Sequence, residues 1–242
     1  MPIDIPLYGP RWFNGIDSAF EIIVVFTALS IAYYARKAKN LTGDPKLSAL
    51  ANAFVLIAVS FLIKMVTNIA AYLKLQELGQ VIWFSQAIQV QIFFALGYFL
   101  NRLFFLIALI WLVCLGLEVV DWRLKLLLVI FAAVGTFFSQ YSYVVFHLIA
   151  LVLLVYVVAL AYGVWRETRK LRARTIAVSF LMILVSQVAF LFVGFEPGMY
   201  VLGETIQLVG IAGMLYNQAT LPRPSKGVGL VKPRSVGKSS VR

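Results

Sequence analysis

The chain has 242 residues, of which 62% are hydrophobic and 13% are charged, and its formal net charge is +11. A soluble domain cannot bury so much apolar surface, so this composition excludes a soluble domain and indicates a membrane protein. The single cysteine and the single histidine also exclude a disulfide framework and a metal site built from several Cys and His ligands.

Seven apolar runs follow one another along the chain, and each is long enough to cross the bilayer core as a helix. They lie at about 18–35, 48–73, 95–118, 124–140, 143–165, 175–195 and 198–218. We therefore predict an all-α, polytopic membrane protein in which residues 1–218 form a bundle of seven transmembrane helices. The first 20 residues lack the basic and then apolar layout of a signal peptide, and we expect them to be a short exposed tail.

The third run lies in an ambiguous region, because the 41 residues from 81 to 121 could hold one span or two. Charge decides between these alternatives. Seventeen of the 21 Lys and Arg residues fall in four clusters, which follow the first, third, fifth and seventh runs. One span in 81–121 places all four clusters on one side, as the positive-inside rule requires, and predicts an outer N-terminus and a cytoplasmic C-terminus. Residues 75–94 then form an outer interfacial or helical extension.

The last residues, 219–242, carry six basic residues, three prolines and no acid. This composition predicts a disordered cytoplasmic tail. Its expected partners are the lipid bilayer and anionic lipids at the cytoplasmic face, and nucleic acid or the ribosome is a less favoured alternative. Together with the seven runs, the tail predicts a multi-pass protein of the plasma membrane.

An internal repeat relates the two halves of the chain. The segment "ALANAFVLIAVSFLIK" (49–64) aligns with "TIAVSFLMILVSQVAF" (175–190) when Ser60 is placed on Ser186. In the same order, "LGYFLN" (96–101) aligns with "LGETIQ" (202–207). The pattern predicts a parallel repeat of runs 1–3 and 5–7 around a linking fourth span, a 3+1+3 arrangement. Chance similarity between apolar helices is the alternative.

With these segments, the chain resembles uncharacterised seven-helix membrane proteins common in archaea. Its 3+1+3 pattern resembles that of microbial rhodopsins and of the small sugar-transporting and PQ-loop seven-helix proteins. The resemblance implies a seven-helix fold and no particular activity. The seventh run contains no lysine to which retinal could attach, and the chain contains no Pro-Gln pair. We therefore expect no retinal and no other cofactor.

Polar residues within the runs gather at one depth, in the half of the membrane that the predicted orientation makes the outer one. They are Glu21, Lys64, Asn68, Asn101, Arg102, His147, Gln187, Glu204 and Gln207. A charge at the bilayer centre costs roughly 2.5–3.5 kcal/mol, so we expect these residues to face the bundle interior and to pair there. For Arg102 the expected partners are the two acids, the neighbouring amides or a bound anion.

Three interpretations of this polar layer stay open. It could be a pocket that is open to the outside and holds a small polar or anionic molecule. It could instead be a buried network of ion pairs that fixes helix register without a ligand. In the third interpretation, Arg102 and Lys64 only extend to the outer headgroups. Taken alone, His147 is more typical of a hydrogen bond in the core than of a ligand to haem or a metal.

Two further patterns concern packing. The aromatic residues, 14% of the chain, are expected mostly to face lipid or the membrane interface, and not to surround a cofactor. Gly203, Gly210 and Gly213 in the seventh run predict close contact with a neighbouring helix.

The sequence argues against an enzyme, because no serine has a base close to it in the chain and no cluster of His and Asp lies in the runs. Three classes of function remain. We favour a sensor or adaptor whose outward pocket is coupled to a cytoplasmic or membrane protein partner. A small-solute transporter built on the repeat is the first alternative, and a structural subunit of a larger membrane complex is the second.

Overall fold

The computed structural model of the chain describes residues 10–13, 15–77, 84–119, 121–139 and 143–219. In these ranges the chain is helical, as the sequence predicts. A short 3-10 helix, η1 (Arg11–Phe13), precedes seven α-helices. These are α1 (Ile16–Thr42), α2 (Pro45–Glu77), α3 (Phe84–Gly116), α4 (Trp122–Ser139), α5 (Tyr143–Thr168), α6 (Leu171–Leu191) and α7 (Gly198–Ala219). The predicted tail from residue 220 onward lies outside the described residues.

Six of the seven helices are long and apolar enough to cross a membrane, and α4 is the helix that is not among them. At about 1.5 Å per residue, the 18 residues of α4 reach about 27 Å, slightly less than a hydrocarbon core of about 30 Å. Its first turns also carry Arg123 and Lys125. The multi-pass membrane architecture is therefore confirmed for six helices.

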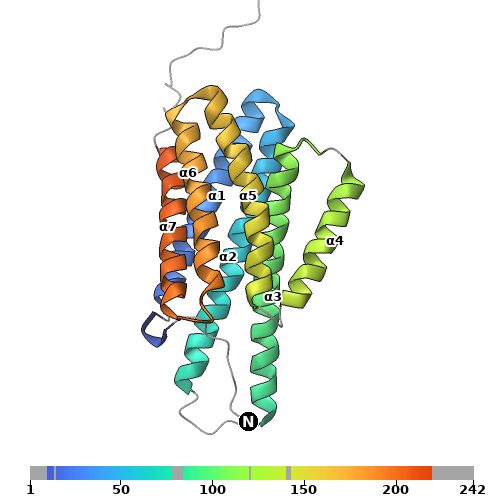
Figure 1. Cartoon of the computed structure of the whole chain (residues 1–242). Coiled ribbons are helices and arrows are strands. Elements are labelled where there is room, and N and C mark those ends of the chain that lie inside the picture. The colour runs from blue at the N-terminus through green and yellow to red at the C-terminus, as the bar shows by residue number, and fades with distance from the viewer. Residues whose placement is uncertain (1–9, 14, 78–83, 120, 140–142, 220–242) are drawn as a thin grey trace, which may run out of the picture.

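The extension predicted at 75–94 is in large part a continuation of two helices. α2 continues to Glu77 and α3 begins at Phe84, while residues 78–83 lie outside the described part. Each of these helices has 33 residues and so spans about 50 Å, well beyond the bilayer core of about 30 Å. In Figure 1 the end of α2 and the start of α3 project below the other helices. The helix bounds differ from the approximate predicted ones by several residues, as at the end of α6, which lies at Leu191 and not at about 195.

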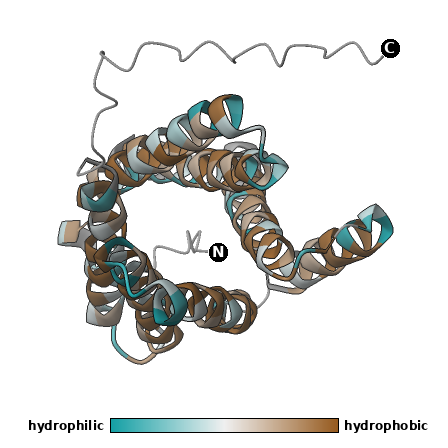
Figure 2. Ribbon diagram, turned by 90° about the horizontal axis from the view of Figure 1, so that it is seen from above, coloured by the Kyte–Doolittle hydropathy of each residue, from teal (hydrophilic) through white to brown (hydrophobic). Residues whose placement is uncertain are grey.

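The helices pack in two groups of consecutive helices. α2 packs against α1 and α3, and α6 packs against α5 and α7. The two groups meet where α1 contacts α7 and where α3 contacts α5. The main contacts of α4 are with α3 and α5, and this helix stands apart from the bundle at the right of Figure 1. Seen from above, the two groups face each other, and most of their ribbons are hydrophobic (Figure 2).

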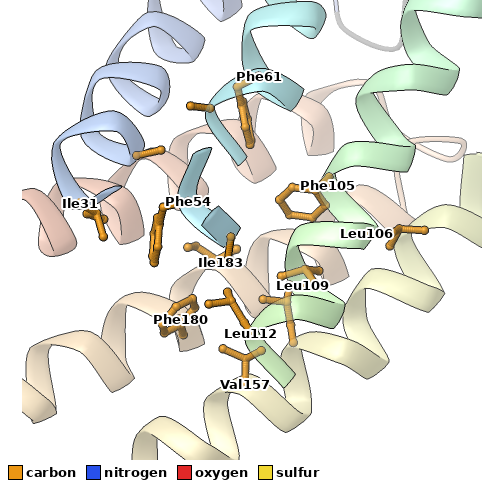
Figure 3. Packing of buried hydrophobic residues seen from close by; sticks show 14 of the residues in the cluster. Ile31, Phe54, Phe61, Phe105, Leu106, Leu109, Leu112, Val157, Phe180 and Ile183 are labelled. Atoms are coloured by element: carbon orange, nitrogen blue, oxygen red, sulfur yellow. The ribbon is translucent and has the colours of Figure 1, made fainter. Parts of the chain in front are cut away.

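The apolar core lies between the two groups. Leu106 and Leu109 of α3 and Leu154 of α5 are almost fully buried. In Figure 3 the labelled side chains of α2, α3 and α6 converge on this space. Alanines, among them Ala28 and Ala51, line the buried sides of α1 and α2 and let the two backbones come close. Close approach of this kind favours helix association in a membrane, where van der Waals contact replaces the hydrophobic effect.

The glycines of α7 lie against α6, as the sequence predicts. A Cβ atom on Gly210 would lie 2.7 Å from the backbone oxygen of Ser179, and one on Gly203 would lie 2.6 Å from the ring of Phe190. In the first group, a Cβ atom on Gly97 of α3 would lie still closer, 2.2 Å, to Oγ1 of Thr67 in α2. These contacts fix how near the helices within each group can approach.

Candidate functional site

A cavity of about 80 Å³ lies between the two helix groups, at the end of the bundle where α1, α5 and α7 begin. This volume is the space open to the centre of a water molecule, and one water needs roughly 10–15 Å³ of it. The cavity therefore has room for several waters or one small solute. Every helix except α4 contributes to its wall. The wall consists of Asp17, Phe61, Lys64, Asn68, Tyr98, Asn101, Arg102, Phe105, Tyr143, Phe146, His147, Gln187, Phe190, Tyr200, Glu204 and Gln207.

The structure brings the predicted polar residues together. Eight of the nine line this cavity. The ninth, Glu21, is completely buried beside it and contacts two of the lining residues, Lys64 and Asn68. Position along each helix was enough to predict this grouping, since all nine lie at a similar depth.

Lys64 is at the centre of an acidic cluster. Its Nζ lies 2.5 Å from Oε1 of Glu204 in α7 and 3.1 Å from Oε1 of Glu21 in α1. The ammonium also lies 5.8 Å from the ring centres of Phe61 and Tyr200. Because Glu204 belongs to the second helix group, this ion pair bridges the two groups.

A network of hydrogen bonds holds the third acid, Asp17, at the start of α1. Its Oδ1 accepts the backbone N–H groups of Gly15 and Ser18, at 2.9 and 2.8 Å. Asn68 Nδ2 donates to Asp17 Oδ2 at 3.0 Å and to Glu21 Oε1 at 2.8 Å. The Asn68 oxygen in turn accepts the hydroxyl of Tyr98 at 3.0 Å. Asn68 therefore joins α1, α2 and α3 on this wall.

Arg102 faces the bundle interior, as predicted, and its side chain is only 5% exposed. Its guanidinium carbon lies 5.7 Å from the ring centre of Tyr143 and 5.6 Å from that of Phe146, both on α5. The interpretation in which Arg102 only extends to the headgroups is therefore wrong. In the described part of the chain, the ion pairs of Glu21 and Glu204 are with Lys64, so the partner of Arg102 stays a prediction.

His147 is held by a hydrogen bond and by aromatic rings. Its Nδ1 lies 2.8 Å from the side-chain oxygen of Gln187. The imidazole also contacts the rings of Tyr143, Phe146 and Phe190. This hydrogen bond in the core is what the sequence predicts for the residue. Nε2 is buried and has no hydrogen-bond partner among the described residues.

Asn101 connects α3 to α2 through hydrogen bonds to Ser60, the residue that was placed on Ser186 in the alignment of the repeat. Its Nδ2 donates to the backbone oxygen and to Oγ of Ser60, both at 2.9 Å, and the Ser60 hydroxyl donates to the Asn101 backbone oxygen at 2.9 Å. Ser186 is equally buried, but its hydroxyl donates to Ile183 in its own helix at 2.6 Å. The hydrogen bonds of the two serines therefore differ.

Sequence reasoning missed a large part of the wall. It placed Asp17 in an exposed tail, whereas the carboxyl is buried and joined to Asn68. It also assigned the aromatics mainly to lipid, whereas seven of them line the cavity. Tyr98, Tyr143 and Tyr200 add hydroxyl groups to these walls. All three lie within a few residues of a predicted polar residue on the same helix, and this proximity is the signal that could have found them.

The expected N-terminal tail covers this end of the bundle with one buried side chain. Phe13 of η1 is 3% exposed and packs against Phe20, Phe190, Val193 and Tyr200. Its ring centre lies 6.0 Å from that of Tyr200, and Tyr200 and Phe190 both line the cavity. The expectation of an exposed tail is therefore wrong for Phe13, although the adjacent Trp12 is 67% exposed.

A second, smaller cavity of about 30 Å³ continues from the first toward the opposite end of the bundle. The two cavities share the walls formed by Phe61, Phe105 and Gln207. On α1, Asp17 lines the first cavity and Ile31 lines the second. These two residues are 14 positions apart, so the two cavities together extend along about 21 Å of this helix. The second cavity is almost entirely apolar.

Comparison of the chain with protein-family models, with curated proteins and with solved structures gave no match. The resemblance to archaeal seven-helix proteins and to microbial rhodopsins therefore stays a prediction. The case for a function rests on the geometry of the cavity.

Proposed function

We propose that this chain is a non-enzymatic membrane sensor or adaptor that binds a small polar solute in the cavity between its two helix groups. The observation that carries the proposal is the composition of that cavity. Charged, amide and imidazole side chains from six helices surround a space large enough for a solute. A purely structural ion-pair network, which is the alternative, needs only enough space for its own charges and for bridging waters.

The contacts at the cavity would couple binding to the relative position of the two groups. Lys64 of α2 pairs with Glu204 of α7, and Arg102 of α3 lies against Tyr143 and Phe146 of α5. A solute that competes for these charged groups changes contacts on both sides of the boundary. Since a ligand shifts a conformational equilibrium only through different contacts in the two states, such a location is what a sensor requires.

The distribution of charge supports an outward-facing cavity. The basic clusters at 36–46 and 166–174 lie at the ends of α1 and α5 and at the starts of α2 and α6, and the cavity lies at the opposite end of these helices. By the positive-inside rule the basic end is cytoplasmic, so the N-terminus is outside.

The direction of α4 supports a seventh crossing. α3 and α5 run in the same direction, because Gly116 near the end of α3 lies against Leu160 near the end of α5. The helix between them must return across the bundle, and α4 does so in Figure 1. With Arg123 and Lys125 reaching the cytoplasmic headgroups, α4 would cross a bilayer that thins locally around it, which is how a span shorter than the hydrocarbon core is accommodated.

Binding is tested with purified full-length protein in lipid nanodiscs by isothermal titration calorimetry against small polar solutes. The panel contains neutral, anionic, cationic and zwitterionic compounds. We expect at least one class to bind to the protein, and we expect Arg102→Met to weaken that binding while the protein stays folded. Lys46→Met is the matched control, since it removes an exposed cation at the other end of the bundle. If none of the panel binds, the proposal is wrong.

A small-solute transporter is the second candidate, and the second cavity is the observation that favours it. The two cavities together follow the boundary between the helix groups for about 21 Å of a core of about 30 Å. A 3+1+3 repeat would make the groups two equivalent halves that move about this boundary. Thr27 and Gln207 are the two residues with polar side chains among those that line the otherwise apolar inner cavity.

Uptake into proteoliposomes separates the two candidates. A transporter accumulates or equilibrates a solute that binds in nanodiscs, and enlarging a side chain in the inner cavity, as in Val24→Phe, blocks uptake while outer binding persists. A sensor binds the same solute without uptake above that of empty liposomes.

A further inference from the structure

We infer that the acids beside the cavity bind a proton, and that Glu21 is the residue that holds it. The inference goes beyond the proposed solute binding and does not depend on it, because the proton neutralises a charge of the protein itself. It follows from the number of buried charges at this end of the bundle and from the way in which hydrogen-bond donors are distributed over the Glu21 carboxyl group.

The charged groups around the cavity do not balance. Among the described residues, the cavity wall and Glu21 beside it carry three carboxyl groups and two basic side chains. All of them are buried except Lys64, whose side chain is 15% exposed. Whatever group Arg102 contacts, one negative charge is left over when every group is ionised. Since a buried charge without compensation is costly, carboxyl groups in this situation bind a proton instead.

The three acids lie close to one another. Oε1 of Glu21 and Oε1 of Glu204 both contact Nζ of Lys64, at 3.1 and 2.5 Å. Oε1 of Glu21 and Oδ2 of Asp17 likewise share Nδ2 of Asn68, at 2.8 and 3.0 Å. Carboxyl groups that share a site in this way bind a proton more readily than isolated ones, because like charges disfavour each other.

The distribution of donors decides which acid holds the proton. Asp17 accepts hydrogen bonds on both carboxyl oxygens, and Glu204 has the shorter contact with Lys64. In Glu21, Lys64 and Asn68 both contact Oε1, whereas Oε2 is buried and has no hydrogen-bond partner among the described residues. A proton on Oε2 matches this asymmetry, because Oε1 is then the carbonyl oxygen that accepts. A buried hydroxyl without a partner also costs less than a buried anionic oxygen without one.

The other titratable side chains of this region do not replace Glu21 as the site of the proton. α1 packs against α2 and α7, which bring Lys64, Tyr200 and Glu204 to the cluster, and the rest of the wall adds Tyr98, Arg102, Tyr143 and His147. At neutral pH lysine, arginine and tyrosine side chains already hold their protons. A proton on His147 would leave the negative charge on the acids and add a positive charge among aromatic rings. On Glu21 the same proton removes a charge.

Proton binding acts on the contact between the two helix groups. Lys64 of α2 is shared between Glu21 in its own group and Glu204 in the other. When Glu21 is neutral, Glu204 is the anionic partner of Lys64, and the pair that joins the groups is strengthened. Loss of the proton gives Lys64 a second anion within its own group and weakens that link. The cluster therefore makes the boundary between the groups sensitive to pH.

The test observes the proton directly. Infrared spectroscopy of the full chain in nanodiscs, without added solute, follows the carbonyl stretch of protonated carboxylic acids from mildly acidic to alkaline pH. We expect a band that is lost at high pH in the unaltered protein and is absent from Glu21→Gln. Glu196→Gln, which removes an exposed acid at the same end of the bundle, should keep the band. Glu204→Gln should lose the band at lower pH than the unaltered protein, because it removes the excess negative charge.

Thermal unfolding is the second measurement. A glutamate in an unfolded chain is ionised above about pH 4.3, so unfolding releases the proton, and stability falls as the pH rises through the range in which Glu21 loses it. Glu21→Gln should fold and lose this pH dependence, because its amide imitates the neutral acid and keeps the Oε1 contacts. Glu196→Gln should retain it.

Three results would overturn the inference. They are the absence of the acid band from the unaltered protein, its persistence in Glu21→Gln, and failure of Glu21→Gln to fold. Solute binding is measured in a separate experiment, so each of these results leaves the proposed function as it stands.

Discussion

Lys64 of α2 and Glu204 of α7, 140 positions apart in the chain, form an ion pair with 2.5 Å between Nζ and Oε1. The lysine side chain is 15% exposed and the glutamate side chain 4%. Removing one partner of a buried pair leaves the other charge without compensation, which typically costs about 3–5 kcal/mol. This cost makes the pair a principal link between the two helix groups.

We predict that Lys64→Met lowers the free energy of unfolding by about 3–5 kcal/mol, because it leaves both Glu21 and Glu204 without their cation. The triple variant Lys64→Met, Glu21→Gln, Glu204→Gln should recover most of this loss. Denaturant unfolding of the detergent-solubilised protein measures both effects. Lys46→Met is the control, because its pair with Glu118 is exposed and should matter little. A triple variant that is less stable than Lys64→Met would contradict this assignment.

Denaturant unfolding also tests whether Lys64 or Arg102 is the main ion-pair partner of Glu204. The geometry predicts a large coupling energy between Lys64→Met and Glu204→Gln in a double-mutant cycle, and a smaller one between Arg102→Met and Glu204→Gln. If the coupling energy between Arg102 and Glu204 were equal to or larger than that between Lys64 and Glu204, the assignment of Lys64 as the main partner of Glu204 would be wrong.

The sequence was sufficient to predict the depth of each polar residue, but not which residues pair. Depth follows from position along a span, and eight of the nine predicted residues therefore line one cavity. Pairing depends on the rotation of each helix about its axis, which hydropathy leaves undetermined because the runs are apolar on all sides. For this reason the sequence could not decide which base pairs with Glu21 and Glu204, and the buried carboxyl of Asp17 was treated as part of a tail.

The contact between α6 and α7 gives a prediction about packing. Gly210→Ala should destabilise the protein by about 1–3 kcal/mol, because the new Cβ would lie 2.7 Å from the backbone oxygen of Ser179 and the helices would have to separate. Gly163→Ala is the matched control in α5, where no atom lies within 4 Å of the added Cβ. There we expect a stabilisation of up to about 1 kcal/mol from helix propensity. Thermal unfolding of both variants checks the contrast, and equal effects would argue against tight contact at Gly210.

Phe13 is predicted to limit access to the cavity. It packs on Tyr200 and Phe190, so Phe13→Ala should open a path to residues on the wall. A cysteine placed at Gln207, in a chain that also carries Cys114→Ala, reports this access through its rate of reaction with a small thiol reagent. The rate should rise in Phe13→Ala and stay unchanged in Trp12→Ala, since Trp12 is largely exposed. Equal rates in all three proteins would show that Phe13 does not cover the cavity.

The last prediction concerns orientation, on which the outward-facing cavity depends. Lys170, between α5 and α6, and Glu196, between α6 and α7, are both exposed and lie at opposite ends of α6. In a Cys114→Ala background, Glu196→Cys should react with a membrane-impermeant maleimide on intact cells. Lys170→Cys should react only after the cells are permeabilised, because the basic cluster around it favours the cytoplasmic side. Asp121→Cys, at the start of α4, should behave like Lys170→Cys if α4 returns across the membrane. If Lys170→Cys were labelled on intact cells, the orientation would be the opposite of the predicted one, and the polar cavity would lie at the cytoplasmic face.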